Sequence, residues 1–386
     1  MDLGFKLSGC NIIWANDVFP EAVETYKYNI DQNIVLGDIT QISSNEIPNN
    51  PDIVIGGFPC QGFSVANNNR SMEDKRNFLY KELLRIIRDK QPKFFVAENV
   101  KGLLSIENGE VIKLIIKDFE NIGYKVDYKV LNAADFGVPQ ARERVIIIGN
   151  RLGIDNVFPE PTHSKNGKKG QTKHISVKDA IEDLSAIEIS KEDILLQDGQ
   201  TIYNHIAYTN VAEKFFGRKY EVDQIELCAY LRKYKNKAKL SNKKIAELMN
   251  LPQTKVEHWF RDDNNSGSIP SKEDYLKLKE ILNLDDTYEK ELTEYEEKEI
   301  KFDQSLRITK WDAPSRTITA TTPEIHINKQ RRLSVRECAR LQTFPDDFKF
   351  FGTIDKQYRQ VGNAVPVKLA EAIAKEIISV LKGENP

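Results

Sequence analysis

The 386-residue sequence is poor in the residues that build metal and disulfide sites, with only four cysteines and five histidines. Cys10, Cys60, Cys228 and Cys338 are scattered, with no CxxC pair and no histidine at metal-ligand spacing. A chain of this size does not depend on so few cysteines for a disulfide framework, and no metal site is expected. Except for Cys60, each cysteine is expected to be a small buried hydrophobic residue.

Long apolar runs are also missing. No segment reaches the roughly 18 apolar residues of a membrane helix, and the N-terminal segment carries no signal-peptide pattern. These absences predict a cytoplasmic protein that does not bind membranes. With 40% hydrophobic and 30% charged residues, the chain has the composition of a globular protein long enough for two domains.

The net charge of −2 excludes a protein that binds polyanions over its whole surface. Residues 231–262, however, hold nine Lys/Arg against three Asp/Glu, whereas residues 285–300 are rich in acidic side chains. A basic block in a neutral protein indicates a localised nucleic-acid contact. The alternative is a solvated helix face.

Apolar runs and amphipathic stretches alternate over the first 150 residues. This alternation predicts a mostly parallel sheet with helices on both faces, in which ligands bind at the carboxyl ends of the strands. The expected strands cover residues 11–17, 52–59, 93–100, 124–133 and 142–150, and the expected helices cover 20–30, 75–90 and 109–123.

The regular pattern stops after residue 150. Residues 158–174 are rich in Pro, Gly and Lys and are expected to form a loop or linker, and one helical block comes after them at 224–283. Order returns from residue 305, with amphipathic helices expected at 333–344 and 366–382.

Three segments carry side chains suited to chemistry. GGFPCQGFS (56–64) places Cys60 on a Gly/Pro turn at the end of a strand, where a thiolate could attack a substrate; the alternative is an inert buried thiol. AENV (97–100) places Glu98 at another strand end, as a candidate acid or as half of an ion pair. QARERV (140–145) adds Arg142 and Arg144 on one face of an extended segment.

The ordered set PCQ, ENV, QxRxR, RRLSVRECARLQTFP (331–345) and QVGNAVP (360–366) resembles the motifs of the DNA (cytosine-5) methyltransferases of bacterial restriction–modification systems. The resemblance implies an α/β fold. A Rossmann-like class I methyltransferase domain would comprise residues 1–155 and 305–386. Residues 156–304 would form a smaller, variable target-recognition domain with a helical, helix-turn-helix-like insertion.

The resemblance also implies the reaction, which is methylation of C5 of a cytosine flipped out of a specific duplex sequence. Cys60 would add to C6 of the ring, and Glu98 would bind N3 and the exocyclic amine. Arg144 would hydrogen-bond the base O2. Arg142 and Gln140 would support the Cys60 loop or contact the nearby DNA backbone.

The resemblance implies two further groups of residues. Gln61, Ser64 and the polar loop 67–77 would clamp the flipped strand, unless the loop is a simple surface turn. The implied methyl donor is S-adenosylmethionine, whose ribose hydroxyls Asp17 would bind and whose adenine amine Asp38 would bind. The same pocket would include Val18, Ile39, Pro59, Asn363, Ala364 and Val365. Taken alone, either aspartate could be a helix cap or turn residue.

The sequence departs from the family in one respect. It lacks the family's first strand and FxGxGG loop, and MDLGFKLSGC (1–10) matches the family's segment just after that loop. Loss of this central strand would unpair both neighbouring ladders and weaken cofactor binding. The start could have been assigned to an internal Met, a separate polypeptide could supply the strand, or the chain could be a degenerate copy.

Within the variable region, residues 231–263 are typical of a helix-turn-helix motif. Ser241 would cap the first helix, and a core would form from Ile245, Ala246, Leu248, Met249, Val256 and Trp259. The second helix would present Gln253, Thr254, Lys255, His258 and Arg261 to DNA. The alternative is a helical insertion whose basic face touches phosphates or nothing.

The preferred interpretation is therefore a monomeric enzyme that acts on double-stranded DNA, with a cognate restriction endonuclease as a possible partner in the same system. Methylation of tRNA cytosine is the second interpretation, because one RNA branch of the family shares these motifs. A catalytically silent DNA-binding protein is the third, and the departure at the N-terminus supports it.

Overall fold

The computed structural model describes residues 1–58, 79–168, 170–209, 224–261, 269–293, 307–321, 323–328 and 330–383. The chain divides into two compact units. The larger unit comprises Met1–Ile206, Trp311–Thr321 and Val335–Pro386, and the smaller unit comprises Ala207–Lys310 and Thr322–Ser334. A domain boundary was expected near residue 155. In the structure the first unit instead continues to Ile206, because residues 156–206 pack with the larger unit. No helix within the described ranges has the length and apolar character needed to cross a membrane.

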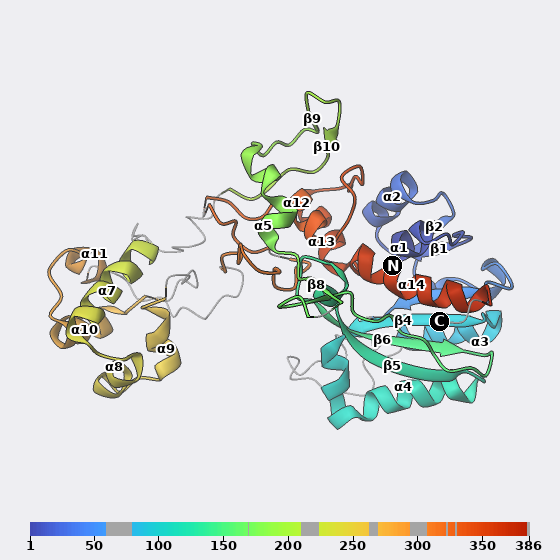
Figure 1. Cartoon of the computed structure of the whole chain (residues 1–386), viewed down its shortest axis with the longest axis horizontal. Helices are drawn as coiled ribbons and strands as arrows, with labels where there is room; N and C mark the ends of the chain where they lie inside the picture. Colours follow the sequence, from blue (N-terminus) through green and yellow to red (C-terminus); the bar gives the residue numbers. More distant parts are fainter. Residues whose placement is uncertain are drawn as a thin grey trace. The chain divides into compact units, whose positions relative to one another are not determined.

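The main sheet of the larger unit has the order β3-β4-β6-β5 (Figure 1). β3 (Ile53–Gly57) pairs in parallel with β4 (Phe94–Val100). β6 (Glu143–Asn150) runs antiparallel to both β4 and β5 (Lys125–Asn132). β3, β4 and β5 therefore run in the same direction, as the prediction of a mostly parallel sheet requires, and β6 is the exception. Two consecutive strands joined by a short connection return in opposite directions, and hydrophobic periodicity does not encode strand direction.

A second sheet pairs β1 (Ala15–Asp17) in parallel with β2 (Ile34–Leu36), and α2 (Pro20–Asn29) connects the two strands. Among the described residues, β1 pairs only with β2 and β3 pairs only with β4. Within those same ranges the two sheets are thus separate, and β1 and β3 each keep one edge without a neighbouring strand.

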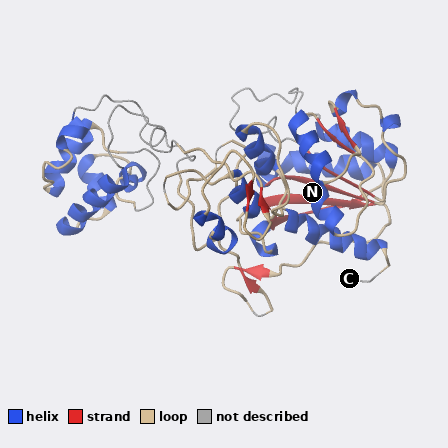
Figure 2. Ribbon diagram, turned by 90° about the horizontal axis from the view of Figure 1, so that it is seen from above, coloured by secondary structure: helices blue, strands red, loops and turns tan. Residues whose placement is uncertain are grey.

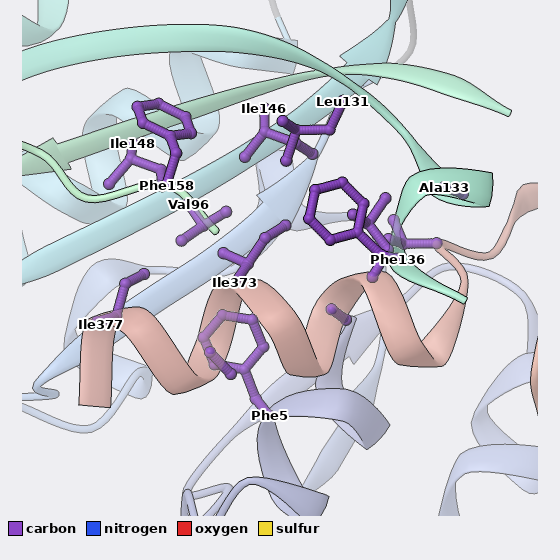
Figure 3. Close-up of a cluster of buried hydrophobic side chains, with 14 of the residues drawn as sticks. Phe5, Val96, Leu131, Ala133, Phe136, Ile146, Ile148, Phe158, Ile373 and Ile377 are labelled. Atoms are coloured by element: carbon purple, nitrogen blue, oxygen red, sulfur yellow. The ribbon is translucent and has the colours of Figure 1, made fainter. Parts of the chain in front are cut away.

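Helices cover both faces of the main sheet. On one face, Phe5 of α1 (Asp2–Leu7) and Ile373 of α14 (Val367–Leu381) pack against Val96 and Ile146 (Figure 3). On the other face, α3 (Leu79–Lys90) and α4 (Glu110–Asn121) pack against a second cluster that contains Phe95 and Ile147. Consecutive strand residues enter opposite clusters because side chains alternate across a strand.

Most expected helices form near their expected positions, and Figure 2 shows them around the strands. The helices expected at 333–344 and 366–382 appear as α12 (Val335–Leu341) and α14. Pro20 occupies the first turn of α2, where a missing backbone N–H costs nothing. α1, β2 and α13 (Ile354–Asn363) were not predicted from the sequence. Residues 156–206 add α5 (Val177–Ile181) and two short ladders, β7 (His163–Ser164) with β8 (Thr172–Lys173) and β9 (Ile194–Leu195) with β10 (Thr201–Ile202).

The smaller unit contains a helical bundle with a core of its own, drawn in yellow to orange in Figure 1. Its helices are α7 (Gln224–Ala238), α8 (Asn242–Met249), α9 (Gln253–His258), α10 (Lys272–Leu282) and α11 (Glu289–Thr293). The Ser241 side chain accepts from the backbone N–H of Lys244, which confirms the predicted cap. Asn250 ends α8 in the left-handed conformation and so starts the turn to α9.

The predicted packing of these helices is largely confirmed. The buried side chains include Ile245, Ala246, Met249, Val256 and Trp259. Leu248 is the exception. It is 53% exposed, so its assignment to the core is wrong, because it lies on the solvent side of α8.

Candidate active site

The predicted nucleophile Cys60 lies outside the described residues, as do Pro59, Gln61, Ser64 and the loop 67–77. The structure describes the residues that lead toward this segment and the side chains around them. β3 ends at Gly57, and Phe58 comes next as a buried residue. The site can therefore be built from the strand ends that surround Gly57 and Phe58.

Glu98 and Arg144 meet at this edge of the sheet. Glu98 on β4 pairs in register with Gly57 on β3, and a Cβ atom placed on Gly57 would lie 3.5 Å from Glu98 Oε2. Arg144 Nε of β6 lies 2.7 Å from Glu98 Oε1 in an ion pair, although its N–H is not aligned for a hydrogen bond. Both side chains are largely buried, at 14% exposure for Glu98 and 10% for Arg144. Burial lowers the pKa of Arg144, and the Glu98 carboxylate opposes that shift.

Asn99, which the sequence analysis did not single out, holds the segment that precedes Cys60. Its Nδ2 donates a 2.9 Å hydrogen bond to the carbonyl oxygen of Phe58, and its Oδ1 accepts from the backbone N–H of Val100. Asn99 is buried, so both halves of its amide are used inside the protein. Its place directly after Glu98 in the AENV segment was the available signal, because a polar residue buried next to a catalytic candidate needs partners.

Arg142 is also buried, at 2% exposure. Its Nη1 donates to the carbonyl oxygen of Ile318 (3.0 Å), and its Nη2 donates to that of Gly362 (2.9 Å). Burial and the neighbouring Arg144 guanidinium lower the pKa of Arg142 to about 9. Arg142 therefore links the end of α13 to the segment 315–321. Because its two Nη groups donate to these carbonyl oxygens inside the protein, the guanidinium is not available to contact the DNA backbone.

Gln140 occupies a similar position. It is fully buried, its Nε2 donates to Gln342 Oε1 (3.0 Å), and its Oε1 accepts from the N–H of Ile318 (3.0 Å). Gln342 in turn donates to the carbonyl oxygens of Val361 and Ala364. The expectation of a DNA contact from the Gln140 side chain does not fit this placement, because its polar atoms are used within the protein.

A cavity of about 1050 Å³ opens beside these strand ends. It is bordered by β1 on one side and β3 on the other, and by the end of α13. The residues expected to hold the cofactor that line it are Asp17, Ile39, Asn363, Ala364 and Val365, and Glu98 lines it as well. Val18 and Asp38 are not among its lining residues.

The two aspartates expected to bind the cofactor differ in their surroundings. Asp17 ends β1 and accepts a 2.8 Å hydrogen bond from the backbone N–H of Phe19. Burial raises the pKa of Asp17, against the effect of the backbone N–H groups of Phe19 and Val18. Asp38 instead caps a short 3₁₀ turn by accepting from Thr40, and these hydrogen bonds lower its pKa. Asp38 therefore has the helix-cap role that the sequence analysis left open, and Val18 is 54% exposed.

The cavity fits S-adenosylmethionine in part. Asp17 offers a partly desolvated carboxylate that ribose hydroxyls can donate to, and Ile39 and Val365 supply apolar wall. The cavity lies between the two sheets, where β1 and β3 have no neighbouring strand among the described residues. No glycine-rich loop borders it within the described residues, so the described fit concerns the ribose and adenine end of the cofactor.

The helix α9 carries the residues expected to contact DNA. Gln253 and Thr254 on α9 are exposed, as is Arg261, which lies three residues beyond its end, and His258 is half-buried. Lys255 is exposed as well, but it is also paired within the bundle: its Nζ lies 2.8 Å from Asp274 Oδ2 on α10 in an ion pair. Lys255 thus links α9 to α10, while 46% of its side chain stays exposed.

Comparison with known proteins agrees with this geometry. The family model described as C-5 cytosine-specific DNA methylase matches residues 1–379. The chain is 35% identical to the type II methyltransferase M.NgoFVII of Neisseria gonorrhoeae, over 98% of this chain and 84% of that protein. It is also 35% identical to the type II methyltransferase M.FnuDI of Fusobacterium nucleatum, over 99% of this chain and 92% of that protein.

The fold is similar to that of a candidate DNA modification methyltransferase encoded within an E. coli prophage. The TM-score is 0.59 at 22% identity, covering 98% of this chain and 95% of the other. This likeness shows a Rossmann-like α/β methyltransferase fold. The match across the chain and the two relatives show more: the chain belongs to the C-5 cytosine-specific DNA methylases and is an enzyme that transfers a methyl group from S-adenosylmethionine to carbon 5 of cytosine in DNA.

Proposed function

We propose that this enzyme works by covalent catalysis through Cys60 on a cytosine extruded from duplex DNA, with Glu98 and Arg144 binding the extruded ring. The ion pair between Glu98 and Arg144 carries this proposal. It brings a carboxylate and a guanidinium together at the edge of the cavity, beside Gly57, which precedes Cys60 by three residues.

Addition of the Cys60 thiolate to C6 breaks the C5–C6 double bond and makes C5 electron-rich. S-adenosylmethionine supplies the methyl group on a positively charged sulfur. Once C5 carries the methyl group, the donor has become a neutral thioether. A base, for which water can serve, then takes the C5 proton, and the electrons of that C–H bond re-form the C5–C6 double bond and expel the Cys60 thiolate from C6. Glu98 assists the addition when it carries a proton: its carboxyl group donates to N3 and accepts from the exocyclic amine, where charge changes during attack.

Arg144 supports this chemistry in two ways. Its guanidinium fixes the orientation of the Glu98 carboxylate through the 2.7 Å ion pair, and it is a donor for the O2 atom of the base. Arg142, Gln140 and Asn99 act as positioning residues, because their hydrogen bonds end on the segments that border the site. Asp17, Ile39 and the Asn363–Val365 segment would hold the cofactor.

A duplex with 5-fluorocytosine at the target position tests the mechanism, because the fluorine cannot leave as a proton does. We expect a covalent adduct that survives denaturing gel electrophoresis, and we expect Cys60→Ser to abolish it. Glu98→Gln should slow its formation by about a hundredfold or more. An active preparation that forms no adduct, or a Cys60→Ser variant that keeps more than a few per cent of the rate, would refute the role of Cys60. Transfer of labelled methyl groups to tRNA and not to duplex DNA would instead support the RNA-directed alternative.

We also propose that the helical bundle α7–α11 reads the target sequence through α9, with Gln253, Thr254, His258 and Arg261 facing the duplex. Three observations support this: the capped helix-turn-helix geometry, the exposed polar face of α9 and the basic residues of α7 and α8. In this role the enzyme would act as a monomer in the cytoplasm and protect host DNA from a cognate endonuclease. Bisulfite mapping of DNA from expressing cells would identify the modified sequence.

A further inference from the structure

The polar face of α9 contains an ordered row of side chains with a carboxylate at its centre. Val256, Trp259 and Phe260 are buried in the bundle core, whereas Gln253 and Arg261 are exposed. Residues four positions apart lie on one face of a helix, so Gln253, Glu257 and Arg261 fall in one row that continues past the end of α9. Glu257 occupies the middle of the surface expected to face DNA.

Contacts on both sides hold this carboxylate in place. Gln253 Nε2 donates a 2.6 Å hydrogen bond to Glu257 Oε1. Arg261 Nη2 lies 3.8 Å from Glu257 Oε2. The Glu257 side chain keeps 29% of its surface exposed, so the carboxylate is oriented but still accessible.

A carboxylate at this position is unfavourable for binding that depends on phosphate contacts alone. Residues 224–261 carry nine Lys/Arg and only three Asp/Glu, so Glu257 opposes the charge of its surroundings. Near DNA it would be repelled by the phosphates. It becomes favourable where it can accept a hydrogen bond from the edge of a base, because that contact also satisfies the desolvated carboxylate.

The major groove offers two exocyclic amines to such an acceptor. In a base pair, the N4 amine of cytosine has an acceptor on one side only, the O6 of the paired guanine. The N6 amine of adenine lies between two acceptors, N7 and the O4 of the paired thymine, so the repulsion of a carboxylate is greater there. The neighbouring guanidinium of Arg261 matches the O6 and N7 acceptors of guanine. The row therefore combines an acceptor suited to cytosine with a donor suited to guanine.

We propose that Glu257 is a specificity-determining residue that accepts a hydrogen bond from the N4 amine of a cytosine in the major groove, with Gln253 and Arg261 as its positioning residues. This inference rests on the proposal that α9 faces the duplex. Lys255 takes no part in the row, because its ammonium group is paired with Asp274.

The test uses the complete chain, in the wild-type form and as the Glu257→Gln variant, which removes the charge and keeps the shape. Glu247→Gln on α8 is the matched control, because Glu247 is an exposed glutamate in a 3.4 Å contact with Lys244. Each protein selects duplexes from a randomised pool, and fluorescence anisotropy then measures Kd for the selected duplex and for single-base variants of it. Melting temperatures establish that each variant is folded.

We expect wild-type protein to prefer cytosine at one position by roughly tenfold to a hundredfold over thymine, whose O4 is an acceptor. Glu257→Gln should lose most of that preference at this position only, and Glu247→Gln should keep it. If Glu257→Gln binds every duplex more tightly and the order of preference is unchanged, the inference is overturned, because Glu257 then only repels the DNA phosphates. Unchanged binding and preference would overturn it as well.

An Arg261→Gln variant separates this inference from the proposal on which it rests. If Arg261→Gln weakens binding while Glu257→Gln leaves the order of preference unchanged, α9 contacts DNA and only the role of Glu257 is refuted. If neither variant changes Kd for any duplex, α9 does not contact DNA and both proposals fail.

Discussion

Asn99 donates a 2.9 Å hydrogen bond to the carbonyl oxygen of Phe58, two residues before the proposed nucleophile. Phe58 is itself buried, with its ring 6.1 Å from that of Tyr80. The contact therefore joins the residue after Glu98 to the chain that leads to Cys60. It couples the two halves of the proposed catalytic site through one amide.

Replacement of Asn99 by Ala should lower kcat more than it changes the KM for cofactor. The substitution leaves a buried carbonyl oxygen without its donor, which costs about 1–3 kcal/mol of stability. Displacement of the nucleophile by a fraction of an ångström should slow turnover by about tenfold to a hundredfold. Steady-state kinetics with both substrates measures the effect. Ser105→Ala, which removes an exposed side-chain hydrogen bond to the Gly102 carbonyl, is the control and should leave kcat unchanged.

Gly362 should not tolerate a side chain. A Cβ atom there would lie 2.4 Å from the carbonyl carbon and oxygen of Thr319, and backbone atoms cannot move aside cheaply. We expect Gly362→Ala to reduce the free energy of unfolding by about 1–3 kcal/mol or more. At Gly102 the nearest atom to a new Cβ is Val100 Cγ2 at 3.9 Å, so Gly102→Ala is the matched substitution. Equal urea midpoints for the two variants would contradict the close approach at Gly362.

Arg142→Lys should loosen the end of α13. A single ammonium group cannot donate to Ile318 and Gly362 in the forked geometry of the guanidinium, so one buried carbonyl loses its partner. The expected loss of stability is about 1–3 kcal/mol, with weaker cofactor binding because Asn363 is the next residue after Gly362. Calorimetry and urea unfolding measure both effects. Arg151→Lys, at an exposed arginine that contacts Gln91, should change neither.

Asp17→Asn should separate stability from cofactor affinity. Burial raises the pKa of Asp17, so the ionised carboxylate costs stability at pH 7, and this cost disappears as the pH falls through the raised pKa. The Asn variant should therefore unfold at a higher temperature at pH 7. Its affinity for S-adenosylmethionine should fall by about tenfold, which corresponds to about 1.4 kcal/mol.

The pH dependence of cofactor binding gives a second measurement for Asp17. Protonation removes an acceptor for the ribose hydroxyls, so wild-type affinity should decrease as the pH falls through the raised pKa of Asp17. Asp17→Asn should lack this decrease. Asp31→Asn, at a partly exposed carboxylate that accepts from the N–H of Asn33, should behave like the wild type. A wild-type pH profile identical to that of Asp17→Asn would show that Asp17 does not bind the cofactor.

The local pattern of apolar and polar residues was sufficient to predict the positions of many helices and strands. It did not predict the direction in which each strand runs in the sheet. β4 was predicted from its apolar run, and it buries Phe94 and Val96 on one face and Phe95 and Ala97 on the other because it lies between two helical layers. The antiparallel course of β6 could not be predicted, since strand pairing depends on contacts between distant segments. α13 was missed although Ile354, Tyr358 and Val361 repeat at helical spacing, because the segment is short and ends in the QVGNAVP motif, which reads as a loop.

The same distinction applies to the site. Glu98 and Arg144 were recognised at strand ends, where the sheet dictates their positions. The burial of Arg142 and Gln140 was not predicted, because polar residues on an extended segment are usually exposed. Residues 318 and 342 supply the hydrogen bonds that make this burial possible, and they lie 176 positions after Arg142 and 202 positions after Gln140.

The helical bundle has a core that is closed on itself. Among the described residues, the cluster formed by Trp259, Tyr275, Leu278 and their neighbours shares no member with the two clusters around the main sheet. Heating should therefore melt the protein in two calorimetric steps, and the bundle could exchange with that of a relative as a cassette. New sequence preferences could then arise without any change to the machinery that forms the carbon–carbon bond.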